Sequence, residues 1–600
     1  MNVNALVLYR SRPARVVGVG DKFEIELPNG GNKRVRDKDL VLLHPGPCSS
    51  LSALDCDGDF DEAWMLLEGE SATLAELAEY ACGAFTPASA WAAWQCLQAG
   101  ELFAGDAQAI RPRAAEAVAA TRRDRAQRAA KAQAWAALLD RLRRGALQPG
   151  DDKQLAELEQ LAFGVTQGSR ILSALGQRET PQNAHQWLLK LGHWDETVNP
   201  QARRRHVPLH DPGASAPALD EQAPRLDLTQ LTAYAIDDED SDDPDDAIAL
   251  DGERIWVHVA DVSALVQPDD ELDIEARRRG GNLYLPEGVV HMLPPAVTQR
   301  LALGLAQTSP AMSFGMVLTD DGELADVRIA LTRVRVERLS YAQAEARLHE
   351  APFAALRARL KRFRERRQAR GWVDLRMPEV SVRLRQGDIV IKPLPALAAR
   401  QLVADAMLLA GMAAAQYAQT HQLAVAFSTQ PPPEQPAQPQ TLSEMFAYRR
   451  QLQRSQLKTV AAPHSGLGLP CYSQVTSPLR RYLDMVCHQQ LRAHLCGERG
   501  IAGDGLLERV GAAEAVIDTL RKAERESNLH WKLAWLQRHP DWRGEAVVLA
   551  QRGRKAVCLL PELALEVGIA ALANKPLDTI AQVALAGVDL PELTARFRLV

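Results

Sequence analysis

The sequence predicts an α+β protein of several domains, and three observations lead to that fold class. A chain of 600 residues and 65.8 kDa exceeds what one hydrophobic core holds, since domains usually contain about 100–200 residues. Both ends of the chain alternate apolar and polar residues as β-strands do, whereas long stretches between them follow the helical period. A polar, proline-bearing linker at 206–224 separates two halves. We therefore expect a small β-domain at each end, a helical region, and a mixed α/β core.

The N-terminal part is predicted to contain a β-domain and a helical unit. Residues 1–70 form a small β-barrel, because strand-like runs flank an Asn-Gly turn at Pro28–Gly31. Residues 71–145 form a helix-turn-helix-like unit of the winged-helix kind, followed by a basic helix; Thr86 and Pro87 are the expected N-cap and first-turn proline of its second helix. Two packed helices without a nucleic-acid role account for the same pattern, so both interpretations stay open.

Two further domains follow a helical region and linker at 146–224. Residues 225–538 form one large mixed α/β domain, with strand-like runs between polar turns and long amphipathic helices at 397–420 and 478–496. Residues 539–600 hold several short strand-like runs. We expect them to form a compact β-barrel of the OB type, similar to an S1 domain.

Charge is unevenly distributed along the chain, although the net charge is only −6. Ten Lys or Arg residues lie between 111 and 144, and eight lie between 357 and 370. Nine of the fifteen residues from 237 to 251 are Asp or Glu. Two basic stretches and one acidic cluster indicate a nucleic-acid enzyme whose metal site contains the carboxylates. Taken alone, each basic run is also accounted for as the solvated face of a helix.

Cysteine usage and hydropathy predict a cytoplasmic protein. None of the eight cysteines forms a C-x-x-C pair, so neither a zinc ribbon nor a disulfide framework is indicated. The most apolar stretch, 402–418, contains Asp405, which argues against a membrane span. Arg10 and Arg12 precede any signal-like apolar region. We expect a monomer without a membrane partner.

The acidic cluster determines the predicted chemistry. Strand-like residues 234–236 lead into Asp237, and residues 247–250 follow Asp246. Carboxylates held between two buried strands repel one another unless cations neutralise them. Because oxygen ligands suit hard ions, we expect Mg²⁺, with Mn²⁺ as the alternative. One or two such ions can activate water and stabilise charge at a phosphorus centre.

Besides a nuclease site, three kinds of segment could contain so many carboxylates. A calcium loop of the EF-hand type would use Asp238, Asp240 and Asp242, but Asp243 and Ala249 stand where that loop requires Gly and Glu. An acidic disordered linker would not be flanked by strands as apolar as these. A single acidic site of the phosphatase kind stays open from this segment alone.

A second cluster of Gly, Ser and Arg supplies the complementary charge. Ser477 and Pro478 are expected to start a helix, with Arg480 and Arg481 on its first turn, where free backbone N–H groups favour an anion. An arginine there can bind phosphate through two parallel hydrogen bonds and stabilise charge that develops in the transition state. Pairing with a local carboxylate such as Asp484 is the alternative.

The motifs and their order resemble the ribonuclease II and ribonuclease R family, the RNB family. The matching motifs are A-I-D-x(5)-D-x-D-D-A-I, VHVADVS, NLYLP followed by MLP, and GLGL-x(2)-Y-x(3)-TSPLRRY. The resemblance covers roughly residues 226–600. It implies a processive exoribonuclease that hydrolyses RNA from the 3′ end to 5′-mononucleotides by a Mg²⁺-dependent, two-metal mechanism.

The resemblance also assigns roles to individual residues. The implied metal ligands are four aspartates: Asp237, Asp243, Asp245 and Asp246. The implied catalytic residues are Asp243, Asp245 and Arg480, and the implied substrate contacts are Tyr284, Glu524 and Arg481. Tyr284 would stack on the 3′-terminal base, and such stacking contributes about 1–3 kcal/mol per base without regard to sequence.

The chain departs from the family pattern in three places. The second aromatic of the base clamp would align near Val382, which carries no ring. Phe427–Gln430 replaces the family's Arg-x-His element. The N-terminal half shows no cold-shock aromatics. Only the catalytic half can therefore be inferred from the family.

Two further classes of protein stay open. One is a catalytically silent RNA-binding scaffold, although such a scaffold has no need of unpaired carboxylates beside a polyanion. The second is a metal-dependent nuclease acting on DNA or inside duplexes. The expected partner is the 3′ end of single-stranded RNA, with structured RNA as a further candidate. His258, His464 and His488 are predicted to be structural, and Asp261 to support the site from behind.

Overall fold

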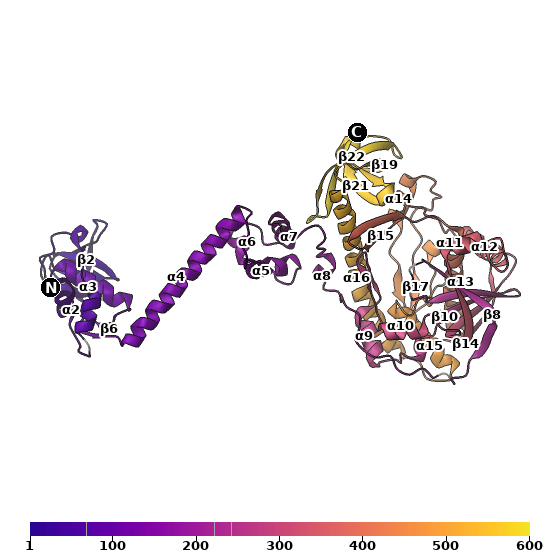
Figure 1. Cartoon of the computed structure of the whole chain (residues 1–600), viewed down its shortest axis with the longest axis horizontal. Helices are drawn as coiled ribbons and strands as arrows, with labels where there is room; N and C mark the ends of the chain where they lie inside the picture. The colour runs from indigo at the N-terminus through magenta and orange to yellow at the C-terminus, as the bar shows by residue number, and fades with distance from the viewer. Residues whose placement is uncertain (68, 221, 240, 242) are drawn as a thin grey trace. The chain divides into compact units, whose positions relative to one another are not determined.

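The computed structural model describes residues 1–67, 69–220, 222–239, 241 and 243–600. Asp240 and Asp242, two of the residues considered as calcium ligands, lie outside these ranges. The chain divides into two compact units, Met1–Arg144 and Gly145–Val600, and each is described by itself (Figure 1).

The first unit begins with a five-stranded antiparallel sheet in the predicted β-domain. Its strand order is β4-β3-β2-β1-β5. Leu6, Val16 and Ile25 are fully buried in the core. Gly30, with φ of 78°, forms the predicted Asn-Gly turn between β3 and β4. Among the described residues, the hydrogen-bonded ladder runs from β4 to β5 without closing. The strands are β1 (Leu6–Tyr9), β2 (Arg12–Gly18), β3 (Phe23–Glu26), β4 (Asn32–Val35) and β5 (Leu40–His44).

Helices complete the first unit, and their ends follow the predicted caps. The Thr86 hydroxyl accepts from the Ser89 N–H, Pro87 occupies the first turn, and Gly100 ends the helix in the left-handed conformation. Only Val118, Leu138, Leu139 and Leu142 of the basic helix α4 are buried, so most of that helix is solvated. The elements are α1 (Phe60–Leu66), α2 (Leu74–Cys82), α3 (Pro87–Ala99), β6 (Phe103–Asp106), β7 (Ala109–Pro112) and α4 (Ala115–Arg143).

The second unit starts with short helices that pack against a long C-terminal helix. The Asn199 side chain donates to the Ser527 hydroxyl at 2.7 Å, and Arg205 pairs with Glu526. The helices are α5 (Asp152–Ala162), α6 (Arg170–Ala174), α7 (Pro181–Lys190), α8 (Gln201–Arg204) and α16 (Gly503–Arg538).

A closed five-stranded barrel forms the centre of the second unit. Its strand order is β10-β13-β14-β8-β9, with β8 and β14 parallel and the other neighbours antiparallel. Gly315 has no side chain because the Trp256 ring lies where a Cβ would stand. The strands are β8 (Leu226–Asp237), β9 (Asp246–Asp251), β10 (Arg254–Ala260), β13 (Ser309–Leu318) and β14 (Leu324–Ser340).

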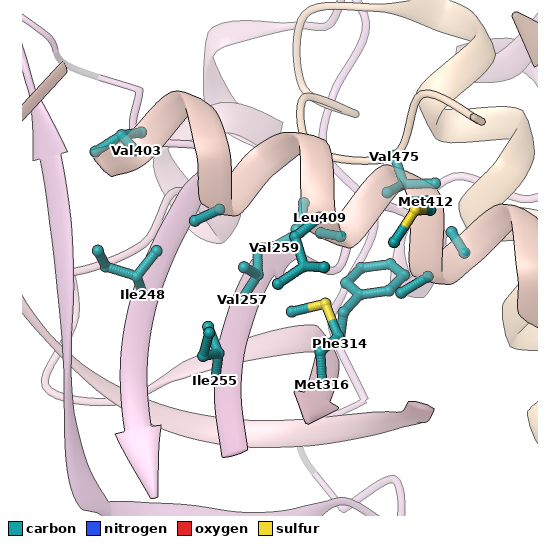
Figure 2. Close-up of a cluster of buried hydrophobic side chains, with 14 of the residues drawn as sticks. Ile248, Ile255, Val257, Val259, Phe314, Met316, Val403, Leu409, Met412 and Val475 are labelled. Atoms are coloured by element: carbon teal, nitrogen blue, oxygen red, sulfur yellow. The ribbon is translucent and has the colours of Figure 1, made fainter. Parts of the chain in front are cut away.

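One face of the barrel packs against helix α13 (Ala398–Thr420). Val257 and Phe314 from the strands meet Leu409 and Met412 from the helix (Figure 2). By length and composition α13 is the one helix among the described residues that could cross a membrane, but 67% of its most apolar window is buried within the protein. Its hydrophobicity is therefore accounted for by the core.

Smaller elements connect the barrel to the rest of the second unit. The helices are α9 (Glu271–Arg279), α10 (Pro295–Leu301), α11 (Tyr341–Ala346), α12 (Phe353–Ala369), α14 (Leu442–Gln451) and α15 (Tyr482–Leu495). The strand pairs are β11 (Leu283–Leu285) with β12 (Gly288–Val290), β15 (Val380–Arg385) with β16 (Asp388–Pro393), and β17 (Phe427–Thr429) with β18 (Gln456–Lys458).

The chain ends in a five-stranded antiparallel sheet at the position of the predicted OB-type domain. Its order is β21-β20-β19-β22-β23, and its core includes Trp531 from α16 and Trp542. The strands are β19 (Arg543–Arg552), β20 (Lys555–Leu560), β21 (Leu565–Ile569), β22 (Ile580–Asp589) and β23 (Thr594–Leu599).

The helix predicted from Ser477 and Pro478 begins later than expected. Helix α15 starts at Tyr482, and Arg481 is its extended N-cap with φ of −135°. The prediction that Arg480 and Arg481 lie on the first helical turn is therefore wrong.

Two carboxylates account for the late helix start. The Ser477 N–H donates to Asp484, and the Leu479 N–H donates to Asp245, each at 2.9 Å. These contacts hold the segment before Tyr482 as a turn against the barrel.

Candidate active site

The end of strand β8 and the start of strand β9 bring the acidic cluster to one cavity. Strand β8 ends at Asp237 and strand β9 begins at Asp246, so the intervening loop leaves and re-enters the barrel at the same place. The cavity has a volume of about 680 Å³. Its acidic and basic lining residues are Asp237, Asp238, Glu239, Asp243, Asp245, Asp246, His291, Arg383, Arg385, Lys392 and Arg480, and Tyr284 also lines it. The four predicted metal ligands thus lie in one space with the predicted catalytic arginine and the predicted stacking tyrosine.

Asp245 is the most enclosed of these carboxylates, with 4% of the residue exposed. One carboxylate oxygen accepts from the Leu479 N–H and the other from Nε of Arg480, both at 2.9 Å. Burial raises the pKa of Asp245 to about 7, and Arg480 opposes that rise. The pair is asymmetric, since 43% of the Arg480 side chain is exposed. Arg480 is therefore anchored at one nitrogen while part of its guanidinium faces the cavity.

The other aspartates are less enclosed. Asp237 accepts from its neighbour's N–H at 2.8 Å and from the Ser241 hydroxyl at 2.6 Å. Burial raises the pKa of Asp243, and it raises the pKa of Asp246 to about 7, with the charge of Asp237 adding to that rise. Within the described ranges, no three His, Cys, Asp or Glu side chains are grouped closely enough to hold an ion as they stand. The carboxylates share one cavity, but several of them hold protein donors instead of meeting one another.

Tyr284 reaches the cavity from strand β11, and Glu524 fixes that strand. A carboxylate oxygen of Glu524, on helix α16, accepts from the Tyr284 N–H at 2.9 Å. The Asn282 side chain donates to the Tyr284 hydroxyl at 3.4 Å. Glu524 is not among the described residues that line the cavity. Its contact with β11 positions the tyrosine, and its contact with a nucleotide stays a prediction.

Arg481 points to a different partner from Arg480. Its guanidinium donates to Asp484 at 2.6 Å and to the Thr476 hydroxyl at 3.4 Å. Arg481 is also not among the cavity-lining residues that the structure describes. The local pairing with Asp484, which the sequence left open, thus holds for Arg481, and its role as a substrate contact stays a prediction.

The basic wall of the cavity was missed by sequence reasoning. Arg383 and Lys392 come from the hairpin β15–β16, far from the acidic cluster in the chain. The alternating run from Val380 to Arg385 carries the signal, but sequence alone does not tell which face of a hairpin meets a cavity. Val382, the position of the missing ring, is 3% exposed and faces the protein core.

The histidines predicted to be structural are buried in the core. The His258 ring meets the Ser313 hydroxyl at 2.7 Å, and the His488 ring meets the Val475 carbonyl at 2.6 Å. Asp261 is fully buried between Arg225 and Arg492, at 2.6 and 2.7 Å. These residues stabilise the barrel and do not line the cavity within the described ranges.

The fold and this site are those of the RNB family. A family model described as RNB domain matches residues 225–446 and 437–497. An uncharacterized ribonuclease of Synechocystis is 32% identical over 590 residues, which cover 91% of this chain and 88% of that relative. The chain therefore belongs to the RNB family of ribonucleases, as its motifs predicted.

A second family model, described as a double HTH domain, matches residues 118–200. That range runs from helix α4 to helix α7, whereas the sequence placed a helix-turn-helix-like unit at 71–145. Helix-turn-helix content is thus supported, and the proposed domain boundaries stay a prediction.

Solved structures share the fold at low sequence identity. A mutant Dss1 exoribonuclease of Candida glabrata matches with a TM-score of 0.66 and 17% identity, covering 100% of this chain and 98% of that one. Mycoplasma genitalium RNase R, in complex with ribose-methylated single-stranded RNA, matches with a TM-score of 0.60 and 19% identity, covering 67% and 77%. Yeast Ssd1, a pseudonuclease, matches with a TM-score of 0.52 and 15% identity, covering 62% and 56%. The same architecture thus occurs in nucleases and in a protein described as inactive.

Proposed function

We propose that this protein is a processive 3′-to-5′ exoribonuclease that hydrolyses RNA to 5′-mononucleotides with the help of Mg²⁺ ions. The observation that carries the proposal is the single cavity that joins Asp237, Asp243, Asp245 and Asp246 with Arg480 and Tyr284. A carboxylate cluster, a guanidinium and a stacking surface are the groups that hydrolysis of a terminal phosphodiester requires.

The donor set fits a hard divalent cation. The described lining has six carboxylates and four Lys or Arg side chains, so its formal charge is two negative units, which is the charge that one divalent ion balances. All predicted ligands are carboxylate oxygens, which Mg²⁺ and Mn²⁺ prefer over softer metals. We assign the binding to Asp237, Asp243, Asp245 and Asp246. When bound, such ions supply an activated water and stabilise charge on the reacting oxygens, and two ions are the form the family resemblance implies.

The protein's own residues position the strand. Tyr284 presents an aromatic face to the last base, and because every base has a π-face this contact does not depend on sequence. Glu524 holds Tyr284 in place through the backbone of β11. The exposed part of the Arg480 guanidinium can donate to a phosphate oxygen as its charge increases. A terminal-base contact beside the carboxylates favours cleavage from an end over cleavage inside a duplex.

A silent RNA-binding scaffold is the second candidate, because the fold also occurs in a pseudonuclease. The retained carboxylates argue against it. A buried aspartate with a raised pKa, such as Asp245, destabilises the fold unless function requires it. A protein that only binds RNA would gain from losing negative charge at this cavity.

The expected partner is the 3′ end of single-stranded RNA, and structured RNA is a further candidate substrate. We also propose a cytoplasmic location and a monomeric state. Structures of the related RNase R with single-stranded and with double-stranded RNA support the choice of RNA as ligand.

The test is a product analysis with RNA oligomers labelled at the 5′ or the 3′ end, single-stranded or duplexed, with Mg²⁺ or with EDTA. The proposal expects immediate release of a labelled mononucleotide from 3′-labelled RNA, and a short limit product from 5′-labelled RNA, only with the metal. Binding without cleavage would favour the scaffold. Internal fragments from duplexes would favour an endonuclease.

A further inference from the structure

The hairpin β15–β16 has two chemically different faces. In its antiparallel register Val382 pairs with Ile391 and Leu384 pairs with Ile389, so these four apolar side chains share one face. That face belongs to the hydrophobic cluster around Trp531 and Trp542. Packing against this cluster fixes the register, because a shift of one residue would expose the apolar set.

The opposite face of the hairpin is forced into the cavity. Ser381 pairs with Lys392, and Arg383 pairs with Val390. All four residues line the same 680 Å³ cavity as the carboxylates. The hairpin therefore presents cations to the active site because its apolar residues are committed to the core.

Arg383 and Lys392 have no ion-pair partner in the described part of the chain. Both residues are exposed. By contrast, Arg480 on another wall is paired with Asp245. If the hairpin cations served only to neutralise the acidic cluster, contacts with its carboxylates would be expected. Two unpaired cations that face a cavity are instead available to an anionic ligand.

We propose that Arg383 and Lys392 bind phosphates of the RNA strand next to the nucleotide being removed. This inference rests on the proposed function and adds a substrate-positioning role for the hairpin. A phosphate that approaches six carboxylates is repelled, and cations on the wall formed by the hairpin offset that repulsion. The strand would then be held by its phosphates on the hairpin and by its last base on Tyr284. Because phosphate contacts carry no sequence information, this arrangement suits an enzyme that advances along any RNA.

The salt dependence of RNA binding tests the inference. Each phosphate neutralised on a single strand contributes about 0.7 to the slope of log K against log salt concentration. The experiment measures anisotropy of a labelled tetranucleotide, short enough to report on the cavity, with the full-length chain in EDTA over about 50–300 mM KCl. We expect the Arg383→Ala/Lys392→Ala double variant to bind roughly tenfold more weakly and to lose about 1.4 from the slope.

Two further variants separate charge from other effects. The charge-preserving double variant Arg383→Lys/Lys392→Arg should retain the parent slope. Lys361→Ala, which removes an exposed cation of helix α12 that lies 3.6 Å from Glu365, should change neither affinity nor slope. An unchanged slope in the double alanine variant overturns the inference, and so does a loss of slope in the charge-preserving variant.

Hydrolysis of the same oligomer by the parent with Mg²⁺ distinguishes the two levels of proposal. A parent that cleaves RNA while the double alanine variant keeps its slope overturns the phosphate track alone. A parent that neither binds nor cleaves RNA overturns the proposed function and this inference with it.

Discussion

At the scale of single residues, the contact between Asp245 and Arg480 organises the site. The carboxylate accepts from Nε of Arg480 and from the Leu479 N–H, each at 2.9 Å, and so ties the turn before helix α15 to strand β9. A residue that both orients the arginine and adds negative charge to the cavity is sensitive to any change in its charge or its acceptors.

Replacing Asp245 by Asn should abolish hydrolysis and preserve RNA binding. The substitution removes one negative charge from a cavity that a phosphate must enter, so affinity for RNA should stay the same or increase. Turnover should fall to background in a Mg²⁺-dependent release assay, and affinity is read in a filter-binding assay. The matched control is Asp238→Asn, because Asp238 lines the same cavity but pairs with Arg400 at the rim. Turnover by Asp245→Asn within tenfold of the parent would exclude the proposed role.

Replacing Arg480 by Ala should lower the rate of hydrolysis by about 10²–10³, as the loss of one preorganised donor to a developing negative charge does elsewhere. Single-turnover kinetics at saturating RNA measure this effect. Arg480→Lys should recover part of the rate, since it keeps a charge but loses the planar pair of donors. A decrease of less than threefold for Arg480→Ala would contradict the assignment.

The sequence predicted the residues that share a local motif and missed those brought in by tertiary packing. Asp237 and Asp246 could be assigned to one site because they bracket a short loop between two strands. Arg383 and Lys392 could not, since the face that a hairpin turns to the cavity depends on Trp531 and Trp542, which are far away in the chain.

At the scale of elements, the start of helix α15 shows the same limit. Pro478 is a good helix-starting residue, yet the helix begins only at Tyr482. Asp245, distant in the sequence, accepts the Leu479 N–H and holds the turn. Caps made by neighbouring residues, such as Thr86, were predicted correctly because their partners lie within one helical turn.

The contact between helices α7 and α16 should weaken in acid. The His185 and His530 rings lie 6.3 Å apart, and burial lowers the pKa of His185 to about 3 and that of His530 to about 4. Both values are below the ordinary value of about 6.5, so the unfolded state binds protons more readily. Their stabilisation is complete above pH 6.5 and is lost as the pH falls toward 4 and 3, by about 2 kcal/mol per histidine at pH 5.

Urea unfolding at pH 7 and pH 5 measures this effect. His185→Phe, which does not titrate, should show a smaller loss of stability between the two pH values than the parent. His349→Gln is the control, because 80% of the His349 side chain is exposed and its removal should leave the pH dependence unchanged. Equal pH dependence in the parent and in His185→Phe would contradict the prediction.

At the scale of the whole molecule, the division into two units changes where the chain should be cut. The sequence placed the main boundary at the linker 206–224. In the structure, Asn199 and Arg205 already contact Ser527 and Glu526 of helix α16, so the helices before the linker belong to the second unit. These contacts join residues more than 300 positions apart, and no local pattern could predict them.

A protein comprising residues 145–600 should therefore fold and cleave a tetranucleotide at the parent rate, because the candidate active site lies entirely within that unit. It should bind an oligomer of about 30 nucleotides more weakly than the parent and with a salt slope smaller by about 2, since it lacks the solvated basic helix α4 and so about three phosphate contacts. A parent-like slope on the long RNA would show that the first unit makes no phosphate contacts, and would favour the interpretation of its arginines as a solvated surface. Removal of residues 1–224 provides the contrast: it also deletes Asn199 and Arg205, so it should lower the unfolding midpoint as well as the affinity. If both truncated proteins behave alike in stability, the contacts on helix α16 do not hold the helical region in place.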